Sequence, residues 1–283
     1  MGKLQRWWKL SPKHPRSKLM ILDDIAAYTR QLVADRKAGG YYSRIHEEAE
    51  RFVPGKARPF LDNLKAPGLS FICEIKKASP SKGIIAEDFP YLAIAKDYEA
   101  GGAAAISCLT EPHWFKGDIR YLKEVAAAVK TPVLRKDFIV DACQIEEAAV
   151  VGASAILLIA AILTDAEIRG FLDLAHQFGL SVLCEAHDEE EIRRMAAAGA
   201  AVIGVNNRNL KDFTVDLTTA ERLRPLLPKG TLYVAESGMM DETAIRRMKD
   251  AGANAVLIGE FLMRSGDRKG LLEKLIQDIN GKR

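Results

Sequence analysis

From residue 69 onward, short apolar runs alternate with stretches that have the spacing of amphipathic helices. The apolar runs predict strands at 69–77, 103–110, 132–138, 155–160, 181–187, 201–207, 232–238 and 255–260. Each run is apolar throughout instead of alternating with polar residues. That pattern is typical of parallel strands whose two faces are both buried.

Helical periodicity fills the intervals between these strands. It predicts helices at 91–100, 119–129, 142–151, 165–178, 189–198, 218–227 and 242–251, with a last helix at 270–279. A Gly-Ala pair follows four of them, where glycine can end a helix in the left-handed conformation. Eight strand–helix units, spaced by roughly 25 residues, predict an α/β fold of the (β/α)₈ (TIM) barrel type. An open, doubly wound sheet is the alternative, but no Gly-x-Gly-x-x-Gly turn follows the first strand, which disfavours a dinucleotide-binding fold.

The chain before the barrel divides into two parts. Residues 20–68 predict helices at 23–38, 42–52 and 58–64, and we expect this N-terminal helical extension to cap the barrel or cover its mouth. Residues 1–19 are basic and are expected to be a disordered extension, with Met20 as the working start. The barrel itself is expected to span residues 69–283.

The overall charge of +3 conceals this division. Residues 1–19 hold six basic residues and no acidic one, so the remaining 264 residues carry 35 basic and 38 acidic side chains. A mildly acidic body gives no reason to expect a nucleic-acid partner. The chain also has no apolar run near the roughly 20 residues of a membrane helix, so we expect no membrane association and a cytoplasmic location.

Cysteine and histidine positions argue against a metal or disulfide framework. Cys73, Cys108, Cys143 and Cys184 show no metal-ligand spacing and are expected to be buried free thiols. Among the five histidines only His187 lies close to a candidate site residue, Glu185. We expect it to support that residue without touching a ligand.

Polar residues stand at the ends of seven of the eight predicted strands, and only the fourth ends in apolar residues. They are Glu74 and Lys76, Thr110, Lys136 and Asp137, Glu185, Asn206 and Arg208, Glu236 and Ser237, and Gly259 and Glu260. In a barrel of this type the carboxyl ends of the strands form the active site. These residues are therefore expected to share one rim.

Two sub-sites differ in chemistry. Ser237-Gly238 and Gly259-Glu260 follow the last two strands, where such barrels often bind phosphate through backbone N–H groups, and Ser79 could add a hydroxyl. The second sub-site groups charged and amide side chains for acid–base chemistry: Glu74, Lys76, Lys136, Glu185, Asn206 and Arg208. We expect its lysines and glutamates to shift one another's pKa values toward neutrality, although a purely structural network of salt bridges is the alternative.

Several of these segments resemble the indole-3-glycerol phosphate synthase family. They are Glu-Ile-Lys-Lys-Ala-Ser-Pro-Ser-Lys-Gly at 74–83, Leu-Arg-Lys-Asp-Phe-Ile at 134–139, Gly-Val-Asn-Asn-Arg-Asn-Leu at 204–210, Ala-Glu-Ser-Gly at 235–238 and Leu-Ile-Gly-Glu at 257–260. The resemblance covers residue 20 to about residue 280. It implies a carboxy-lyase of tryptophan biosynthesis that converts 1-(2-carboxyphenylamino)-1-deoxyribulose 5-phosphate into indole-3-glycerol phosphate without a cofactor or metal.

The resemblance also implies a role for each site residue. Lys136 would be the general acid of ring closure, Glu185 and Lys76 would transfer protons during dehydration, and Glu74 would hold the lysines in place. Asn206 and Ser237 would contact the substrate, and Arg208 with Lys76 would face its carboxylate. The apolar walls around its ring would be Phe115, Phe138, Leu157 and Leu210. The phosphate site would be Ser79, Gly238, Gly259 and Glu260.

Two positions depart from the family pattern. This chain has Ala78 where some members carry a lysine, which removes one cationic contact to phosphate. It has Glu260 where other members have serine. Because a carboxylate repels phosphate, we expect the Glu260 side chain to turn away and only its N–H to bind.

Two other readings of the barrel stay open at this point. One is an isomerase acting on phosphoribosyl-type substrates, which would not need a second lysine at position 136. The other is a non-catalytic barrel that only binds a phosphorylated ligand. The expected partner in every reading is a small phosphorylated molecule, and other enzymes of the tryptophan pathway are candidate protein partners.

Overall fold

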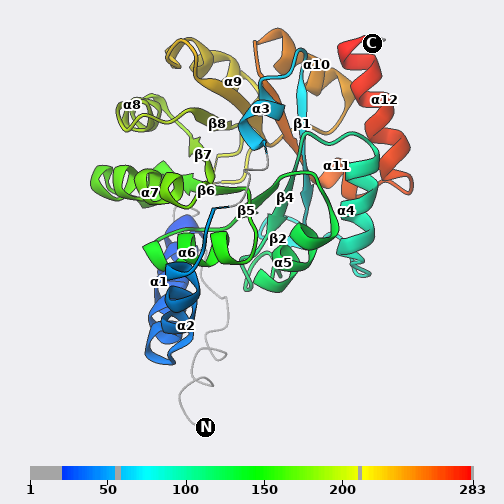
Figure 1. Cartoon of the computed structure of the whole chain (residues 1–283). Helices are drawn as coiled ribbons and strands as arrows, with labels where there is room; N and C mark the ends of the chain where they lie inside the picture. Colours follow the sequence, from blue (N-terminus) through cyan, green and yellow to red (C-terminus); the bar gives the residue numbers. More distant parts are fainter. Residues whose placement is uncertain (1–20, 55–58, 210–211, 282–283) are drawn as a thin grey trace, which may run out of the picture.

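The computed structural model describes residues 21–54, 59–209 and 212–281, and its centre is a closed barrel of eight parallel strands. The strands are β1 (Ser70–Ile75), β4 (Ala105–Leu109), β5 (Val133–Lys136), β6 (Ala155–Ile159), β7 (Ser181–Ala186), β8 (Val202–Asn206), β9 (Leu232–Glu236) and β10 (Ala255–Ile258). Each pairs with its neighbours in sequence, and β1 closes the ring by pairing with both β10 and β4 (Figure 1). The predicted barrel is confirmed.

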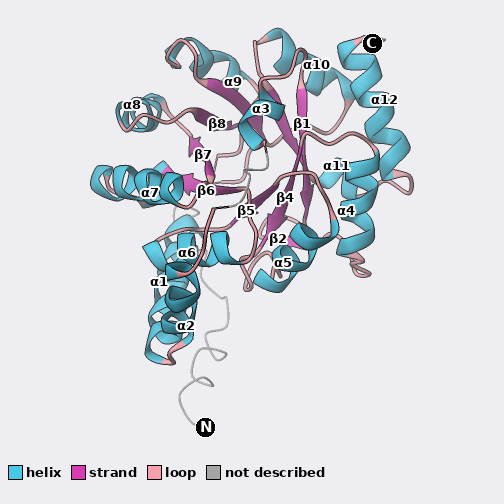
Figure 2. Ribbon diagram, viewed as in Figure 1, coloured by secondary structure: helices cyan, strands magenta, loops and turns pink. Residues whose placement is uncertain are grey.

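Helices surround the barrel in the predicted order (Figure 2). They are α4 (Tyr91–Ala100), α5 (Ile119–Ala128), α6 (Ala142–Val150), α7 (Asp165–Gln177), α8 (Glu189–Ala197), α9 (Thr218–Leu223), α10 (Glu242–Asp250) and α12 (Arg268–Asn280). The predicted helix at 218–227 ends early, because its last turn is the 3₁₀ segment η4 (Arg224–Leu226), which contains Pro225. Proline has no N–H to continue the α-helical pattern. The four glycines of the Gly-Ala pairs all have positive φ, as expected of helix ends.

The helices before the barrel lie at different places on it. They are α1 (Ile21–Ala38), α2 (Tyr41–Glu50) and α3 (Phe60–Leu64). The first turn of α1 lines the mouth cavity with Ile21, Leu22 and Ile25, while α2 lies against α6 (Figure 1). Helix α3 lies at the opposite end, where Asn63 bonds to the backbone of Ala104 and to the hydroxyl of Ser70, at the start of two strands.

Short elements at the carboxyl end of the barrel were not predicted. The loop after β1 folds back as a small antiparallel hairpin of β2 (Ala78–Ser79) and β3 (Gly83–Ile84). Strand β6 runs into the 3₁₀ turn η3 (Ala160–Ile162), and the four-residue helix α11 (Glu260–Met263) follows β10. Strands β1 and β10 therefore end two residues before their predicted limits.

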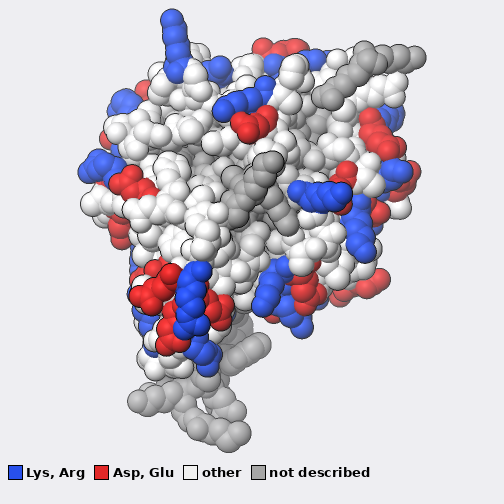
Figure 3. Space-filling model, in the orientation of Figure 1, with Lys and Arg blue, Asp and Glu red and all other residues white. Residues whose placement is uncertain are grey.

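The burial of the cysteines and the mixture of charges on the surface agree with what the sequence predicts. All four cysteines are buried and unpaired, as predicted. On the face shown in Figure 3, basic and acidic side chains are interspersed around a largely uncharged centre, with no broad region of one sign. No helix within the described ranges is long and apolar enough to cross a membrane.

Candidate active site

A cavity at the mouth of the barrel brings the predicted site residues together. Every residue with a predicted catalytic or binding role within the described ranges lines it: Glu74, Lys76, Ser79, Phe115, Lys136, Phe138, Leu157, Glu185, Asn206, Arg208, Ser237, Gly238, Gly259 and Glu260. Thr110, which was also expected at this rim, does not line the cavity, and its hydroxyl donates to Asp137 instead. Leu210 lies outside the described residues. The predicted site residues come from the barrel strands and the loops that follow them, because the parallel strands all finish at this rim.

Lys136 is the centre of the acid–base sub-site. It is the last residue of β5, and its ammonium nitrogen lies 2.8 Å from Glu185 Oε2 on β7 and 2.8 Å from Glu236 Oε2 on β9. Its side chain is 14% exposed and both carboxylates are nearly enclosed. One cation is thus held between two buried acids, with one side open to the cavity.

The pKa values in this cluster move apart instead of converging. Burial alone would lower the pKa of Lys136, but the charges of Glu185 and Glu236 outweigh it and raise that pKa above its usual range. Burial likewise opposes ionisation of Glu185, yet Lys136 and His187 bring its pKa well below the ordinary value. The expected shift toward neutrality is therefore wrong for this pair. Opposite charges in contact stabilise each other's charged form.

Glu236 behaves differently from Glu185. Burial raises its pKa to about 7, because Lys136 is shared with Glu185 and the charges of Glu185 and Glu74 add to the effect. Its Oε1 has no hydrogen-bond partner among the described residues and occupies space left by Gly204, where a Cβ would lie 2.2 Å away. The strand-end pattern located Glu236, but no feature of the sequence indicated a role for it.

Neighbouring polar groups fix the orientation of Glu185. Asn206 Nδ2 donates to Glu185 Oε1 over 2.9 Å, and His187 Nε2 lies 3.2 Å from the same oxygen in an ion pair. Burial lowers the pKa of His187, but its contacts with Glu185 and Glu191 raise it to about 10. The imidazolium therefore supports Glu185 from behind, as expected, and does not line the cavity.

A second Lys–Glu pair faces the cavity from the end of β1. The side chains of Glu74 and Lys76 form a close ion pair, because residues two apart along an extended chain project to the same side. Gly259 is packed against this pair: a Cβ at that position would lie 2.4 Å from Glu74 Oε2 and 3.1 Å from Lys76 Nζ. Glycine at position 259 therefore leaves the space that the Glu74–Lys76 pair occupies.

The predicted phosphate sub-site has an unusual backbone. Ser237 and Gly238 both have positive φ, at 63° and 88°. A Cβ at Gly238 would meet Leu217 at 2.7 Å, so both conformation and space require glycine. Ser79 faces this region from the hairpin after β1. The Glu260 carboxylate is 3.0 Å from Arg264 Nε and 3.9 Å from Lys82 Nζ, so two cations hold its charge.

The opposite side of the cavity is apolar. The rings of Phe115 and Phe138 lie 6.0 Å apart in a tilted arrangement, and Leu157 is buried beside them. Arg208 donates from Nη1 to the carbonyl of Phe213 over 3.1 Å, which holds its guanidinium near the rim. This arrangement suits an aromatic ring bearing an anionic substituent.

The N-terminal helices were expected to cap the barrel or cover its mouth, but the sequence did not show which of their residues reach the cavity. Ile21, Leu22 and Ile25 reach the mouth through docking of a helix that lies far from the strand ends in sequence, and no local pattern reports such docking. The donors needed for a metal are also not assembled: within the described ranges, no group of three or more His, Cys, Asp or Glu is placed to hold an ion.

Solved structures with low sequence identity share the fold. Thiamine phosphate pyrophosphorylase from Pyrococcus furiosus is 16% identical, with a TM-score of 0.57 over 78% of this chain and all of that one. A structure described as native KDPGal is 17% identical, with a TM-score of 0.54 over 75% of this chain and 94% of that one. These likenesses support the barrel architecture alone.

Similarity in sequence identifies a single protein family, which the shared fold does not. A family model for indole-3-glycerol phosphate synthase matches residues 22–275. Proteins of that name from Ruminiclostridium cellulolyticum and Endomicrobium trichonymphae are 51% and 49% identical, each over 90% of this chain and 98% and 99% of their own lengths. The protein of that name from Leuconostoc mesenteroides is 46% identical over 90% of this chain. The chain belongs to the indole-3-glycerol phosphate synthase family.

Proposed function

We propose that this chain converts 1-(2-carboxyphenylamino)-1-deoxyribulose 5-phosphate into indole-3-glycerol phosphate, with release of one CO₂ and one water. The observation that carries the proposal is the ammonium of Lys136, held between Glu185 and Glu236 at the open end of the barrel. It faces a cavity with aromatic walls on one side and a glycine-rich backbone on the other. A substrate with an aromatic ring at one end and a phosphate at the other matches both.

Ring closure is the step assigned to Lys136. The ring carbon that bears the carboxylate attacks the carbonyl carbon of the ribulose chain, and Lys136 gives a proton to the carbonyl oxygen. That oxygen becomes a hydroxyl instead of a high-energy alkoxide. Loss of CO₂ then returns its bonding electron pair to the ring and restores aromaticity. The protein's contribution here is a positioned proton and a fixed charge, as in general acid catalysis.

Dehydration needs a second acid–base pair. A proton must reach the leaving hydroxyl, and another must leave the adjacent carbon of the new ring. We assign these transfers to Lys76 and Glu185, which face the same cavity from β1 and β7. Glu74 holds Lys76, while Asn206 and His187 hold Glu185. Each transferring group thus has a fixed neighbour.

Binding is assigned to a second set of groups, and of the proton-transfer residues only Lys76 also belongs to it. Ser79, Ser237, Gly238, Gly259 and the N–H of Glu260 would hold the phosphate. Phe115, Phe138 and Leu157, together with Leu210, would enclose the ring. Arg208 and Lys76 would face its carboxylate. Anchoring both ends of the substrate places its carbonyl in the middle of the cavity, next to Lys136.

The test is product formation by the purified full chain. Incubation with the ribulose phosphate should produce indole fluorescence and one equivalent of CO₂ for each substrate consumed. Isomerisation of the substrate without CO₂ release would support the isomerase reading. Saturable phosphate binding without any turnover would support the non-catalytic barrel. Either result would overturn the proposal.

A further inference from the structure

Lys136 lies between Arg135 and Asp137, whose side chains bond to each other. Side chains alternate along a strand, so Arg135 and Asp137 face the layer between the barrel and α6. Arg135 is 1% exposed and has the largest of the fully buried side chains in the described part of the chain. Neither residue has a part in the reaction proposed above.

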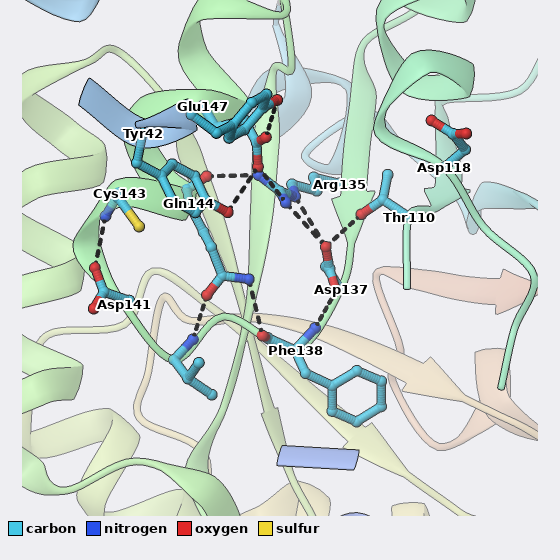
Figure 4. A network of polar contacts seen from close by, with 12 residues as sticks. Tyr42, Thr110, Asp118, Arg135, Asp137, Phe138, Asp141, Cys143, Gln144 and Glu147 are labelled. Atoms are coloured by element: carbon cyan, nitrogen blue, oxygen red, sulfur yellow. Dashed lines mark hydrogen bonds and ion pairs between the residues drawn. The ribbon is translucent and has the colours of Figure 1, made fainter. Parts of the chain in front are cut away.

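Arg135 joins strand β5 to helix α6 (Figure 4). Its Nη2 lies 2.8 Å from Glu147 Oε2 and 3.0 Å from Asp137 Oδ2. Its Nη1 donates to the carbonyl of Gln144 over 2.7 Å. The planar guanidinium therefore holds three acceptors at once, and only arginine offers that fork of donors.

The same network fixes the segment that follows β5. Asp137 accepts a hydrogen bond of 2.6 Å from Thr110, at the end of β4, and one of 2.8 Å from the N–H of Phe138. Gln144 accepts from the N–H of Val140 and donates to the carbonyl of Phe138 (Figure 4). Both residues that flank Lys136 are thus tied to neighbouring elements.

The backbone alone gives Lys136 little support on one side. Its carbonyl accepts from Thr110 N toward β4, but the pairing of β5 with β6 ends one residue earlier, at Arg135 and Ile156. The position of Lys136 therefore depends on the side chains of its neighbours in sequence.

Helix α2 completes the network from outside the barrel. Tyr41 donates to Glu147 Oε1 over 2.6 Å, and Tyr42 lies 3.5 Å from Oε2. Burial raises the pKa of both phenols, with Glu147 adding to the effect, so both remain neutral donors. Arg36 of α1 lies 5.4 Å from the centroid of the Tyr41 ring and interacts electrostatically with Glu147, so two cations offset the two buried carboxylates.

We propose that Glu147 is a positioning residue for Lys136, acting through Arg135 and Asp137, and that Tyr41 holds Glu147 in place from α2. Three contacts in series, from Tyr41 to Glu147, from Glu147 to Arg135 and from Arg135 to Asp137, then set where β5 ends and where the ammonium of Lys136 points. A displacement of about 1 Å at a catalytic group can cost up to 10²-fold in rate. The proposal rests on the proposed function, because turnover is its readout.

The test compares two adjacent glutamates of α6. Glu147→Gln keeps the shape of the side chain and removes its charge, and it should lower kcat about tenfold while KM stays within about twofold. Glu146→Gln is the matched control: Glu146 also joins α6 to α2, through His46 at 3.1 Å, but does not reach Arg135. It should leave kcat unchanged. Circular dichroism and thermal melts identify a temperature at which all variants are folded.

A double-mutant cycle decides whether the effect passes through Lys136. If it does, adding Glu147→Gln to Lys136→Ala should leave the residual rate within about twofold, because the group being positioned is already absent. An equal loss in both backgrounds would overturn the proposal, as would a normal kcat in Glu147→Gln. If Glu147→Gln does not fold, Tyr41→Phe, which removes only the 2.6 Å bond, enters the same cycle. Failure of the wild type to turn over would instead contradict the proposed function.

Discussion

Buried charges at single residues govern the chemistry of this site. Lys136 is charged because Glu185 and Glu236 surround it, and removal of either partner would leave a buried charge less compensated. Breaking a buried pair in this way is strongly destabilising, by about 3–5 kcal/mol. Burial is the main reason that Glu236 has a pKa of about 7, because one ammonium shared by two carboxylates does not fully offset it. A group with that pKa can both give and take a proton near neutral pH.

Titration of Glu236 should appear in the pH dependence of stability. Its pKa rises from 4.5 unfolded to about 7 folded, so the folded state binds the proton more tightly. The resulting stabilisation is complete below pH 4.5 and is lost as the pH rises through 7. Glu236→Gln has no carboxyl group to ionise at this position, so the variant does not lose this stabilisation as the pH rises. Its free energy of unfolding, relative to wild type, should rise between about pH 5 and about pH 8, by about 1.4 kcal/mol per pKa unit. Urea unfolding of both proteins at about pH 5 and about pH 8 measures this difference. A fall in the variant's free energy of unfolding relative to wild type over that range would contradict the raised pKa of Glu236.

Gly259 should be intolerant of even one methyl group. In Gly259→Ala the new Cβ would overlap Glu74 Oε2, at 2.4 Å, and displace the Glu74–Lys76 pair. We expect kcat to fall about tenfold or more with the fold intact. Gly170→Ala is the control, because a Cβ at Gly170 meets nothing within 4 Å. Equal kinetics of the two variants would show that the pair is not needed in this position.

At the residue scale, the sequence located the site but did not predict its electrostatics. Alternation along strands predicts that Glu74 and Lys76 project together, and strand ends predict that Lys136 shares a rim with Glu185. Which carboxylate pairs with which lysine depends on distances across the barrel. The sharing of Lys136 between Glu185 and Glu236, and therefore the raised pKa of Glu236, could not be read from the chain.

Short elements shape the phosphate end of the cavity. The β2–β3 hairpin and α11 have two to four residues each, too few for a detectable period. They bring together residues far apart in sequence, including Lys82 from the hairpin turn and Glu260 from α11. The long strands and helices were predicted within a few residues because their periodicity repeats. These short ones depend on their neighbours for stability.

Glu260 gives a prediction at the level of α11. Glu260 lines the cavity, and its carboxylate is paired with Arg264 and lies near Lys82. Glu260→Ser removes a negative charge from the proposed phosphate site and frees both cations. We expect KM and the inhibition constant of inorganic phosphate to fall about threefold to tenfold, with kcat within about twofold.

Glu242→Ser is the matched control for this substitution. Glu242 also begins a helix and pairs with the arginine four residues on, at 2.6 Å, but it does not line the mouth cavity. It should leave phosphate inhibition unchanged. An unchanged or weaker inhibition by phosphate in Glu260→Ser would show that the Glu260 carboxylate does not act at the phosphate site.

For the whole molecule, the barrel follows from repetition, whereas the docking of the first helices does not. Eight similar units predict a closed ring whatever their details. In contrast, α1 reaches the mouth of the barrel, where Leu22 lines the cavity, and α3 reaches the opposite end, where Asn63 bonds to Ala104. No local pattern in the sequence reveals these contacts. The mouth cavity is therefore finished by a segment that precedes the barrel in sequence.

Removal of residues 1–19 should leave activity intact. The family match begins at residue 22, and the first of the described residues that line the cavity is Ile21. A chain beginning at Met20 should keep kcat/KM within about twofold of the full chain. A chain that also lacks residues 20–25 should lose apolar cavity wall and show a higher KM. A tenfold loss of kcat/KM in the first chain, about 1.4 kcal/mol of transition-state stabilisation, would show that residues 1–19 contribute to the site.

The kinetics of Lys136→Ala are the sharpest test of the proposed reaction. If Lys136 is the acid of ring closure, kcat for indole-3-glycerol phosphate formation should fall by at least about 10², the lower range for general acid catalysis. Inorganic phosphate should still inhibit, because its proposed contacts come from other residues. If the Lys136–Glu185–Glu236 cluster were only structural, the variant would instead show a lower melting temperature and nearly normal turnover below it. A near-normal kcat in the folded variant would contradict the account.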